Sequence, residues 1–68
     1  MTMWRVEVDQ EYKELCGKII RLENFLISYL PSPEEKPRIA LMEIQLNVMK
    51  TYRDILYLRL EEYGGVIE

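Results

Sequence analysis

Apolar residues recur every three or four positions along most of this chain, which is the spacing of a packed helix face. Over residues 37–63 they form two separate stripes. The first stripe comprises Leu41, Ile44, Val48, Ile55 and Leu58. The second stripe comprises Ile39, Met42, Leu46, Met49, Leu56 and Leu60. A helix with two apolar stripes requires neighbours on at least two sides, so this pattern predicts assembly.

The first half of the chain predicts another helix, over residues 10–30. Its seam comprises Tyr12, Leu15, Ile19, Leu22, Leu26 and Tyr29, in unbroken steps of three and four. Asp9 precedes this seam and is a favourable residue to cap the helix. Upstream of Asp9, residues 3–8 alternate apolar and polar side chains, which favours an extended N-terminal arm.

Turn residues separate the two helices. Ser32, Pro33 and Glu35 have the order of a capped helical turn, in which Glu35 reaches back to the cap. Pro37 lacks an amide hydrogen and disfavours a helical residue before it, so the continuous second helix is expected to begin there. Gly64-Gly65 supplies the left-handed conformation that ends a helix, and Val66 or Ile67 is expected to fold back on the last turn.

The short connection predicts an antiparallel pair of helices. We therefore predict an all-α, two-helix hairpin, about residues 10–30 and 37–63, with an extended N-terminal arm. A single domain is expected to span residues 1–68. The first stripe is expected to complete the hairpin. The second would then lie exposed in a monomer and be covered by a symmetry mate.

Length and composition favour a homo-oligomer. A 68-residue chain buries only about 60% of its unfolded surface, and chains of this size usually need disulfides, a metal or self-association. Cys16 is the only cysteine and the chain has no histidine, so neither an intrachain disulfide nor a zinc or haem site is expected. Self-association is the remaining source of stability for a chain of this size.

The charge balance argues against further classes of protein function. The net charge of -3 argues against a binder of DNA or RNA, or of anionic membranes, through a general basic field. No targeting or membrane-spanning pattern is present in the sequence, so a reducing cytoplasm is the expected setting, with Cys16 as a free thiol. Without a histidine base, metal ligands or a paired nucleophile, neither an enzyme nor a cofactor is expected.

Charged side chains interrupt the apolar faces, and a buried charge requires a partner or a ligand. For Glu23 and Arg59 we expect a mutual ion pair that fixes helix register. Arg53 interrupts the second stripe, where Met49, Lys50 and Tyr57 surround it at helical spacing. Several copies of Arg53 at a symmetry axis would repel unless an anion such as a phosphate lay between them. Alternatively, Arg53 pairs with Glu43, Asp54 or Glu61 of a neighbour, or extends to solvent.

A family resemblance adds to this interpretation. Ile39, Ala40, Glu43, Ile44, Gln45, Met49 and Arg53 match, in order, the second helix of the phage anti-CBASS sponges, small hairpin proteins that sequester cyclic-oligonucleotide immune signals. The chain also resembles uncharacterised short helical proteins of crAss-like phages, through residues 11–15, Leu22, residues 25–26 and residues 45–49. It departs from the sponge pattern at Asn47-Val48, where the family usually has Gly-Phe, and at Asp54, where it has alanine.

The sponge resemblance implies a phage-encoded, non-enzymatic homo-oligomer that binds a host signalling nucleotide between its subunits, of the cyclic oligonucleotide or cyclic ADP-ribose type. By position, it implies a phosphate contact at Arg53 and a second one at Lys13. The candidate ligand-binding residues are therefore Arg53, Lys13, Lys50, Met49 and Tyr57. The rival hypothesis is an interaction module that docks a host or phage protein through its surplus apolar stripe.

Overall fold

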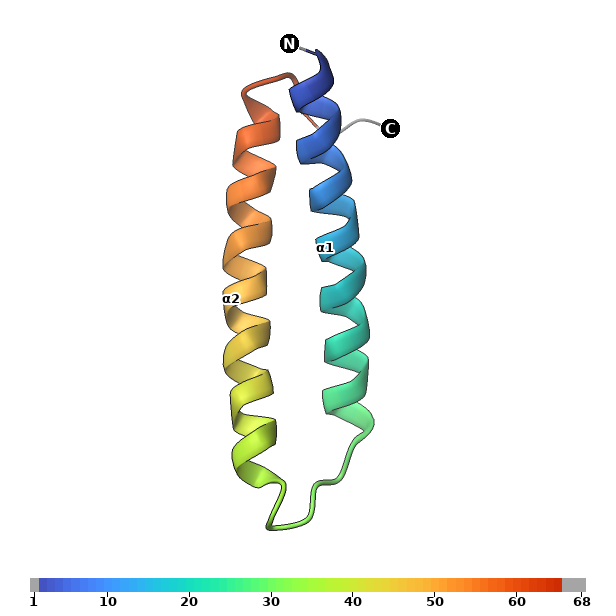
Figure 1. Cartoon of the computed structure of the whole chain (residues 1–68), viewed down its shortest axis with the longest axis vertical. Coiled ribbons are helices and arrows are strands. Elements are labelled where there is room, and N and C mark those ends of the chain that lie inside the picture. The colour runs from blue at the N-terminus through green and yellow to red at the C-terminus, as the bar shows by residue number, and fades with distance from the viewer. Residues whose placement is uncertain (1, 66–68) are drawn as a thin grey trace.

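Two long helices account for most of the molecule, which we describe from a computed structural model covering the backbone of residues 2–65 and the side chains of residues 4–65. Helix α1 spans Thr2–Ser28 and helix α2 spans Lys36–Glu61. They run antiparallel, and both chain ends lie at one end of the rod (Figure 1). The rod measures 50 × 17 × 14 Å. The predicted all-α hairpin is confirmed.

The predicted N-terminal arm is wrong, because α1 begins at Thr2 and not near residue 10. Trp4 and Val8 are four residues apart, so the same pair fits both strand alternation and a helix face. Packing decides between the two. Val8 is 3% exposed and contacts the buried Leu56 and Leu60. The helix therefore runs through Asp9, which is not a cap but pairs within α1 with Lys13, at 3.0 Å between Nζ and Oδ2.

The connection contains the predicted capped turn. The Ser32 amide and hydroxyl donate to Glu35 Oε1 at 3.2 and 2.9 Å, and the Glu35 amide donates back to the Ser32 carbonyl at 2.9 Å. The Tyr29 hydroxyl also donates to the Glu35 carboxylate, which lowers the pKa of Glu35 and raises that of Tyr29. Helix α2 then starts at Lys36, one residue before the predicted position.

Glycine ends the second helix as predicted. Gly64 and Gly65 have φ values of 99° and 100°, a region that other L residues rarely adopt. The Gly65 amide donates to the Leu60 carbonyl at 2.9 Å, so a carbonyl of the last turn is satisfied. Arg5 Nη2 donates to the Gly65 carbonyl at 3.1 Å and ties this end to α1. The predicted contact of Val66 or Ile67 lies outside the described residues.

The two stripes of α2 have the opposite roles to those predicted. The second stripe faces α1: Leu56 and Leu60 are fully buried, and Ile39, Met42, Leu46 and Met49 are half-buried. The first stripe faces away, with Leu41, Ile44, Val48, Ile55 and Leu58 each 48–66% exposed. The prediction failed because both stripes have the same period, so spacing alone cannot tell which one contacts α1. We call this exposed set, with Thr51 between Val48 and Ile55, the outer face of α2.

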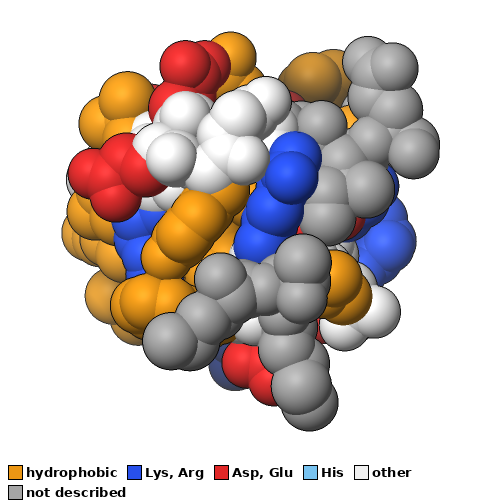
Figure 2. Space-filling view, turned by 90° about the horizontal axis from the view of Figure 1, so that it is seen from above, with side chains coloured by type: hydrophobic (Ala, Val, Ile, Leu, Met, Phe, Trp, Pro, Cys, Tyr) orange, Lys and Arg blue, Asp and Glu red, His pale blue; other side chains and the backbone are white. Residues whose placement is uncertain are grey.

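The outer face of α2 is therefore the surplus apolar surface of the hairpin. Viewed from the end that carries both termini, hydrophobic side chains gather on the side of the molecule formed by α2 (Figure 2). In α1, the predicted seam from Tyr12 to Tyr29 is buried or half-buried, as expected. The hairpin thus covers one face of each helix. Homo-oligomeric assembly stays a prediction.

Candidate functional site

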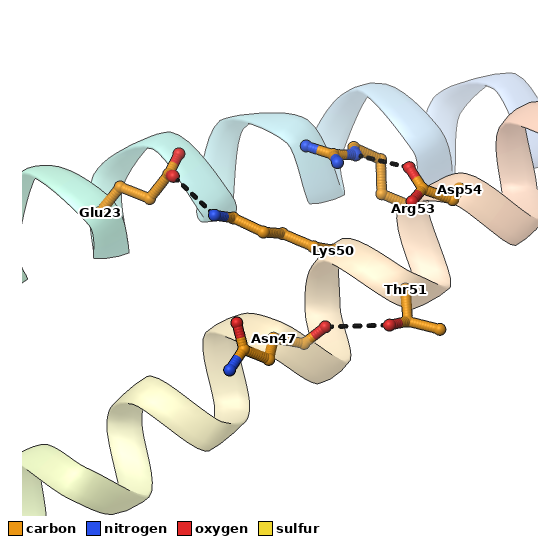
Figure 3. A network of polar contacts seen from close by, with 6 residues as sticks. All are labelled: Glu23, Asn47, Lys50, Thr51, Arg53 and Asp54. Carbon is orange, nitrogen blue, oxygen red and sulfur yellow. Dashed lines mark hydrogen bonds and ion pairs between the residues drawn. The ribbon is translucent and has the colours of Figure 1, made fainter.

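Arg53 lies on α2 at the boundary between the helix interface and solvent, with its side chain 33% exposed. Its Nε is 3.2 Å from Oδ1 of the adjacent Asp54, which is 66% exposed (Figure 3). Among the described residues, the two terminal nitrogens of this guanidinium make no hydrogen bond. These two nitrogens form the end of the guanidinium that binds carboxylates and phosphates in a bidentate manner. That end of Arg53 is available to a ligand.

Arg53 does not occupy the place that the stripe pattern suggested. It belongs to the stripe that faces α1, so it lies away from the outer face of α2. Copies of Arg53 therefore cannot meet at the centre of a contact between two outer faces. Arg53 lies instead where the side of α2 that faces α1 meets solvent. We call this border of α2, with Lys50, Arg53 and Tyr57, the edge of the hairpin. Arg53 contacts Asp54 of its own chain. The alternative pairing with Glu43, Asp54 or Glu61 of a neighbour stays a prediction.

Lys50 lies one turn before Arg53 and bridges the two helices. Its Nζ is 3.0 Å from Oε2 of Glu23 on α1 (Figure 3). The expected Glu23–Arg59 pair is therefore wrong. Arg59 lies near the other end of α2, with its guanidinium 5.5 Å from the centroid of the Trp4 ring. The Glu23–Arg59 prediction failed because an ion pair between the helices requires two residues at the same height along the hairpin. The periodicity of each helix does not specify these heights.

Two tyrosines extend the edge. The rings of Tyr12 on α1 and Tyr57 on α2 have centroids 6.0 Å apart, at an angle of 43°. Burial raises the pKa of Tyr12, with a further upward contribution from the hydrogen bond with Cys16, while the positive charge of Arg53 lowers it. The pKa of Tyr57 is raised by its hydrogen bond to Glu61. Both phenols are therefore neutral hydrogen-bonding groups near neutral pH.

The remaining two candidates are less well placed. Met49 is half-buried on the stripe that faces α1, and its Sδ accepts from Gln45 Nε2 at 3.9 Å. Lys13 is on α1, where its ammonium is held by Asp9, whose side chain is only 7% exposed. Arg53, Lys50 and Tyr57 share one edge of α2, and Lys13 requires a ligand that competes with a nearly buried carboxylate.

Sequence reasoning missed two members of this edge, Tyr12 and Cys16. Tyr12 was assigned only to the seam and Cys16 was considered only as a free thiol, yet Tyr12 is within electrostatic range of both Arg53 and Asp54. A signal was available for the Asp9–Lys13 pair, because an acid four residues before a base is the favourable order on a helix. No comparable signal relates Tyr12 to Arg53 across the hairpin.

The described part of the chain holds no cluster of three or more acidic, cysteine or histidine residues that would bind a metal ion. No helix within residues 2–65 combines the length and apolar character needed to cross a membrane.

The fold places the chain in the class of small all-α helical hairpins, and this hairpin carries a partly exposed arginine, a lysine and two tyrosines along one edge. The family model described as Sequestin matches residues 2–62, so the chain belongs to the Sequestin family. The name of this family indicates sequestration, in agreement with the sponge resemblance of α2. No curated protein and no solved structure has a significant match to the chain.

Proposed function

We propose that this protein is a phage-encoded, non-enzymatic sponge that binds a host immune signalling nucleotide, of the cyclic oligonucleotide or cyclic ADP-ribose type, between the subunits of a homo-oligomer. The observation that carries the proposal is the state of Arg53. Its Nε is bonded to Asp54, and its terminal nitrogens make no hydrogen bond with the described residues. A phosphate of the ligand would bind this free end.

The surroundings of Arg53 fit a nucleotide better than a bare anion. Lys50 is three residues away and contributes a second positive charge, although Glu23 partly neutralises it. Tyr57 is exposed at 42% and presents an aromatic ring against which a base can stack. Because Asp54 adds a negative charge beside Arg53, the ligand must supply contacts besides its phosphate. The base and ribose of a nucleotide meet that requirement.

Retention without cleavage is the chemistry expected of this edge. The side chains here are cations, carboxylates, phenols and one thiol. None of them is paired in the way that activates a nucleophile for attack. The family name also points to sequestration and not to catalysis. Binding energy from Arg53 and the tyrosines would therefore hold the signal away from its receptor.

Isothermal titration calorimetry against cyclic di- and trinucleotides and cyclic ADP-ribose isomers tests this proposal. We expect saturable heat with at least one ligand. The Arg53→Ala variant should lose at least tenfold in affinity, because a charge-assisted hydrogen bond contributes about 1.5–3 kcal/mol. The matched control is Arg21→Ala, which removes an exposed arginine from α1.

Two results would contradict the proposal. One is the absence of heat with every ligand of the panel. The other is an equal loss of affinity in the Arg53→Ala and Arg21→Ala variants, which would show a general charge effect. Circular dichroism on each variant confirms that the hairpin is retained, so a loss of binding cannot be ascribed to unfolding.

The rival function is an interaction module for a host or phage protein, and the outer face of α2 is the observation that favours it. This hypothesis predicts that the isolated chain associates loosely and becomes well ordered only with its partner. Light scattering distinguishes the two functions, because a discrete ligand-free oligomer would count against the rival.

A further inference from the structure

A groove lies between the two helices, on the turn side of the Lys50–Glu23 ion pair. Its volume is about 260 Å³, and its lining residues are Glu23, Leu26, Ile27, Glu43 and Leu46. We call it the turn-side groove. Leu26 and Ile27 come from α1 and Leu46 comes from α2, so both helices contribute aliphatic side chains. The lining is thus apolar apart from two carboxylates.

The two carboxylates of the turn-side groove differ in their partners. Glu23 Oε2 is 3.0 Å from Lys50 Nζ. Glu43 is exposed on α2, and its carboxylate makes no hydrogen bond or ion pair within the described part of the chain. An ionised carboxylate is an acceptor only, with two oxygens side by side. Glu43 therefore offers the groove a pair of free hydrogen-bond acceptors.

Charge changes sign along this side of the hairpin. The guanidinium of Arg53 extends from Asp54 in the direction of the Lys50–Glu23 pair (Figure 3). Beyond that pair lies the groove with Glu43. A simple anion would be repelled by the carboxylates of the groove, and a simple cation would be repelled by Arg53 and Lys50. The occupant that fits this pattern has an anionic end for Arg53 and an end with N–H donors for Glu43.

The spacing of Arg53 and Glu43 suits one nucleotide. The two residues are ten positions apart on α2, which is about 15 Å at about 1.5 Å per residue. A nucleotide extended along the hairpin, with its phosphate on Arg53, brings the hydrogen-bonding edge of its base to Glu43. The face of the base then covers the aliphatic side chains of the groove and removes apolar surface from water. Tyr57 lies on the other side of Arg53 and stays available to a second base.

The four bases differ in what they present to a carboxylate. Guanine has two adjacent donors on its Watson–Crick edge, N1–H and the N2 amino group, so both carboxylate oxygens accept a hydrogen bond. Adenine and cytosine have an acceptor nitrogen beside their amino group, and uracil has its one N–H between two carbonyls. Each of these three bases sets an acceptor against a carboxylate oxygen. A free carboxylate therefore selects guanine.

We propose that the turn-side groove binds a guanine base, with the Glu43 carboxylate accepting hydrogen bonds from its N1–H and its N2 amino group. This inference rests on the proposed function, because Arg53 has to hold the phosphate of the same nucleotide. It narrows the ligand to a cyclic oligonucleotide that contains guanine. A cyclic ADP-ribose isomer has adenine as its base and lacks this contact.

Pairs of ligands that differ only in their bases test the selectivity. Cyclic di- and trinucleotides made only of guanine nucleotides are titrated beside the same rings made only of adenine nucleotides. The parent should bind the guanine form of a ring at least about tenfold more tightly, because charge-assisted hydrogen bonds to Glu43 are lost with adenine. The Arg53→Ala variant should weaken both forms by the same factor, since the phosphate is common to them.

The Glu43→Gln variant gives a result that a merely structural role would not produce. A glutamine carboxamide accepts one hydrogen bond and donates another, which is the pattern that matches adenine. This variant should therefore bind the adenine form at least as tightly as the guanine form. Glu14→Gln is the matched control, because it removes the same charge from an exposed glutamate of α1 and should keep the preference for guanine.

Several results would overturn the guanine proposal and leave the proposed function standing. One is equal or tighter binding of the adenine forms by the parent, or binding of a cyclic ADP-ribose isomer alone. Another is a guanine preference that Glu43→Gln keeps, or that Glu14→Gln also loses. A lower oligomer mass of Glu43→Gln in light scattering would instead assign Glu43 to Arg53 of a neighbour. Absence of binding to every ligand would contradict the proposed function itself, and this inference with it.

Discussion

Leu56 is expected to be one of the residues on which the stability of the hairpin depends most. Its side chain is 0% exposed and packs in a cluster with Val8 and Leu60, bordered by Tyr12 and Leu15. Replacing a buried leucine by alanine costs about 2–5 kcal/mol, depending on how far the surroundings collapse into the cavity. With only two helices around the site, collapse is easy, so we expect the lower half of that range.

Urea unfolding followed by circular dichroism measures this loss. Small proteins have m values of about 1–3 kcal/mol per molar urea, and 68 residues place this chain near the lower limit. The Leu56→Ala midpoint should therefore fall by about 2–3 M relative to the parent. If the parent is less stable than that, the variant will lack helical signal even without urea.

The matched control is Leu30→Ala, the same substitution at a residue that is 93% exposed. Surface changes of this kind are usually within about 0.5 kcal/mol, so its midpoint should stay close to that of the parent. Equal shifts for the two variants would refute the assignment of the core. So would a loss below about 1 kcal/mol at Leu56.

Two further predictions concern the ends of the hairpin. The Gly65→Ala variant should lose about 1 kcal/mol of stability, because φ is 100° there, and a Gly65→Ala change that leaves the thermal midpoint unchanged would contradict this cap. The Tyr29→Phe variant should raise the pKa of Glu35, because the Tyr29 hydroxyl is the main cause of its lowering from 4.5. A lowered pKa means that Glu35 stabilises the fold fully above its unfolded value and that this contribution is lost as the pH falls through its folded value. The variant should therefore lose less stability in acid, and a carbon NMR titration of Glu35 that matches the parent would rule out this link.

The hairpin itself followed from local chemistry. Ser32, Glu35 and the Gly64-Gly65 pair act within a few residues of where they stand in the sequence, so their roles could be predicted and are confirmed. The seam of α1 was predictable for the same reason, since its spacing is a property of one helix. The start of α1 was not, because the helical state of residues 2–9 depends on Val8 packing against α2.

The candidate site was only half predictable. Arg53, Lys50 and Tyr57 could be grouped because they lie on one helix at steps of three and four. Their partners on α1 depend on the rotation and axial position of α2 against α1. Two stripes of equal period leave the rotation of α2 undetermined. The Lys50–Glu23 contact depends on that rotation, so it could not be predicted. Arg53 lies on the side of α2 that faces α1, which the stripe pattern did not specify.

The buried cluster lies near the open end of the hairpin, where both termini emerge, while the turn end has exposed residues such as Ile27 and Leu30 (Figure 1). A force that pulls the two termini apart would separate the helices from the open end towards the turn. The contacts between them would therefore break one after another and not all at once. The first contacts to meet that force are the Arg5–Gly65 hydrogen bond and the contacts of the Trp4 ring with Tyr63 and Arg59, followed by the packing of Val8 on Leu56 and Leu60. The greatest mechanical resistance thus comes at the start of extension. Once this end opens, the rest of the pair, which is held mainly by the buried Ile19 and the Lys50–Glu23 ion pair, should separate at lower force.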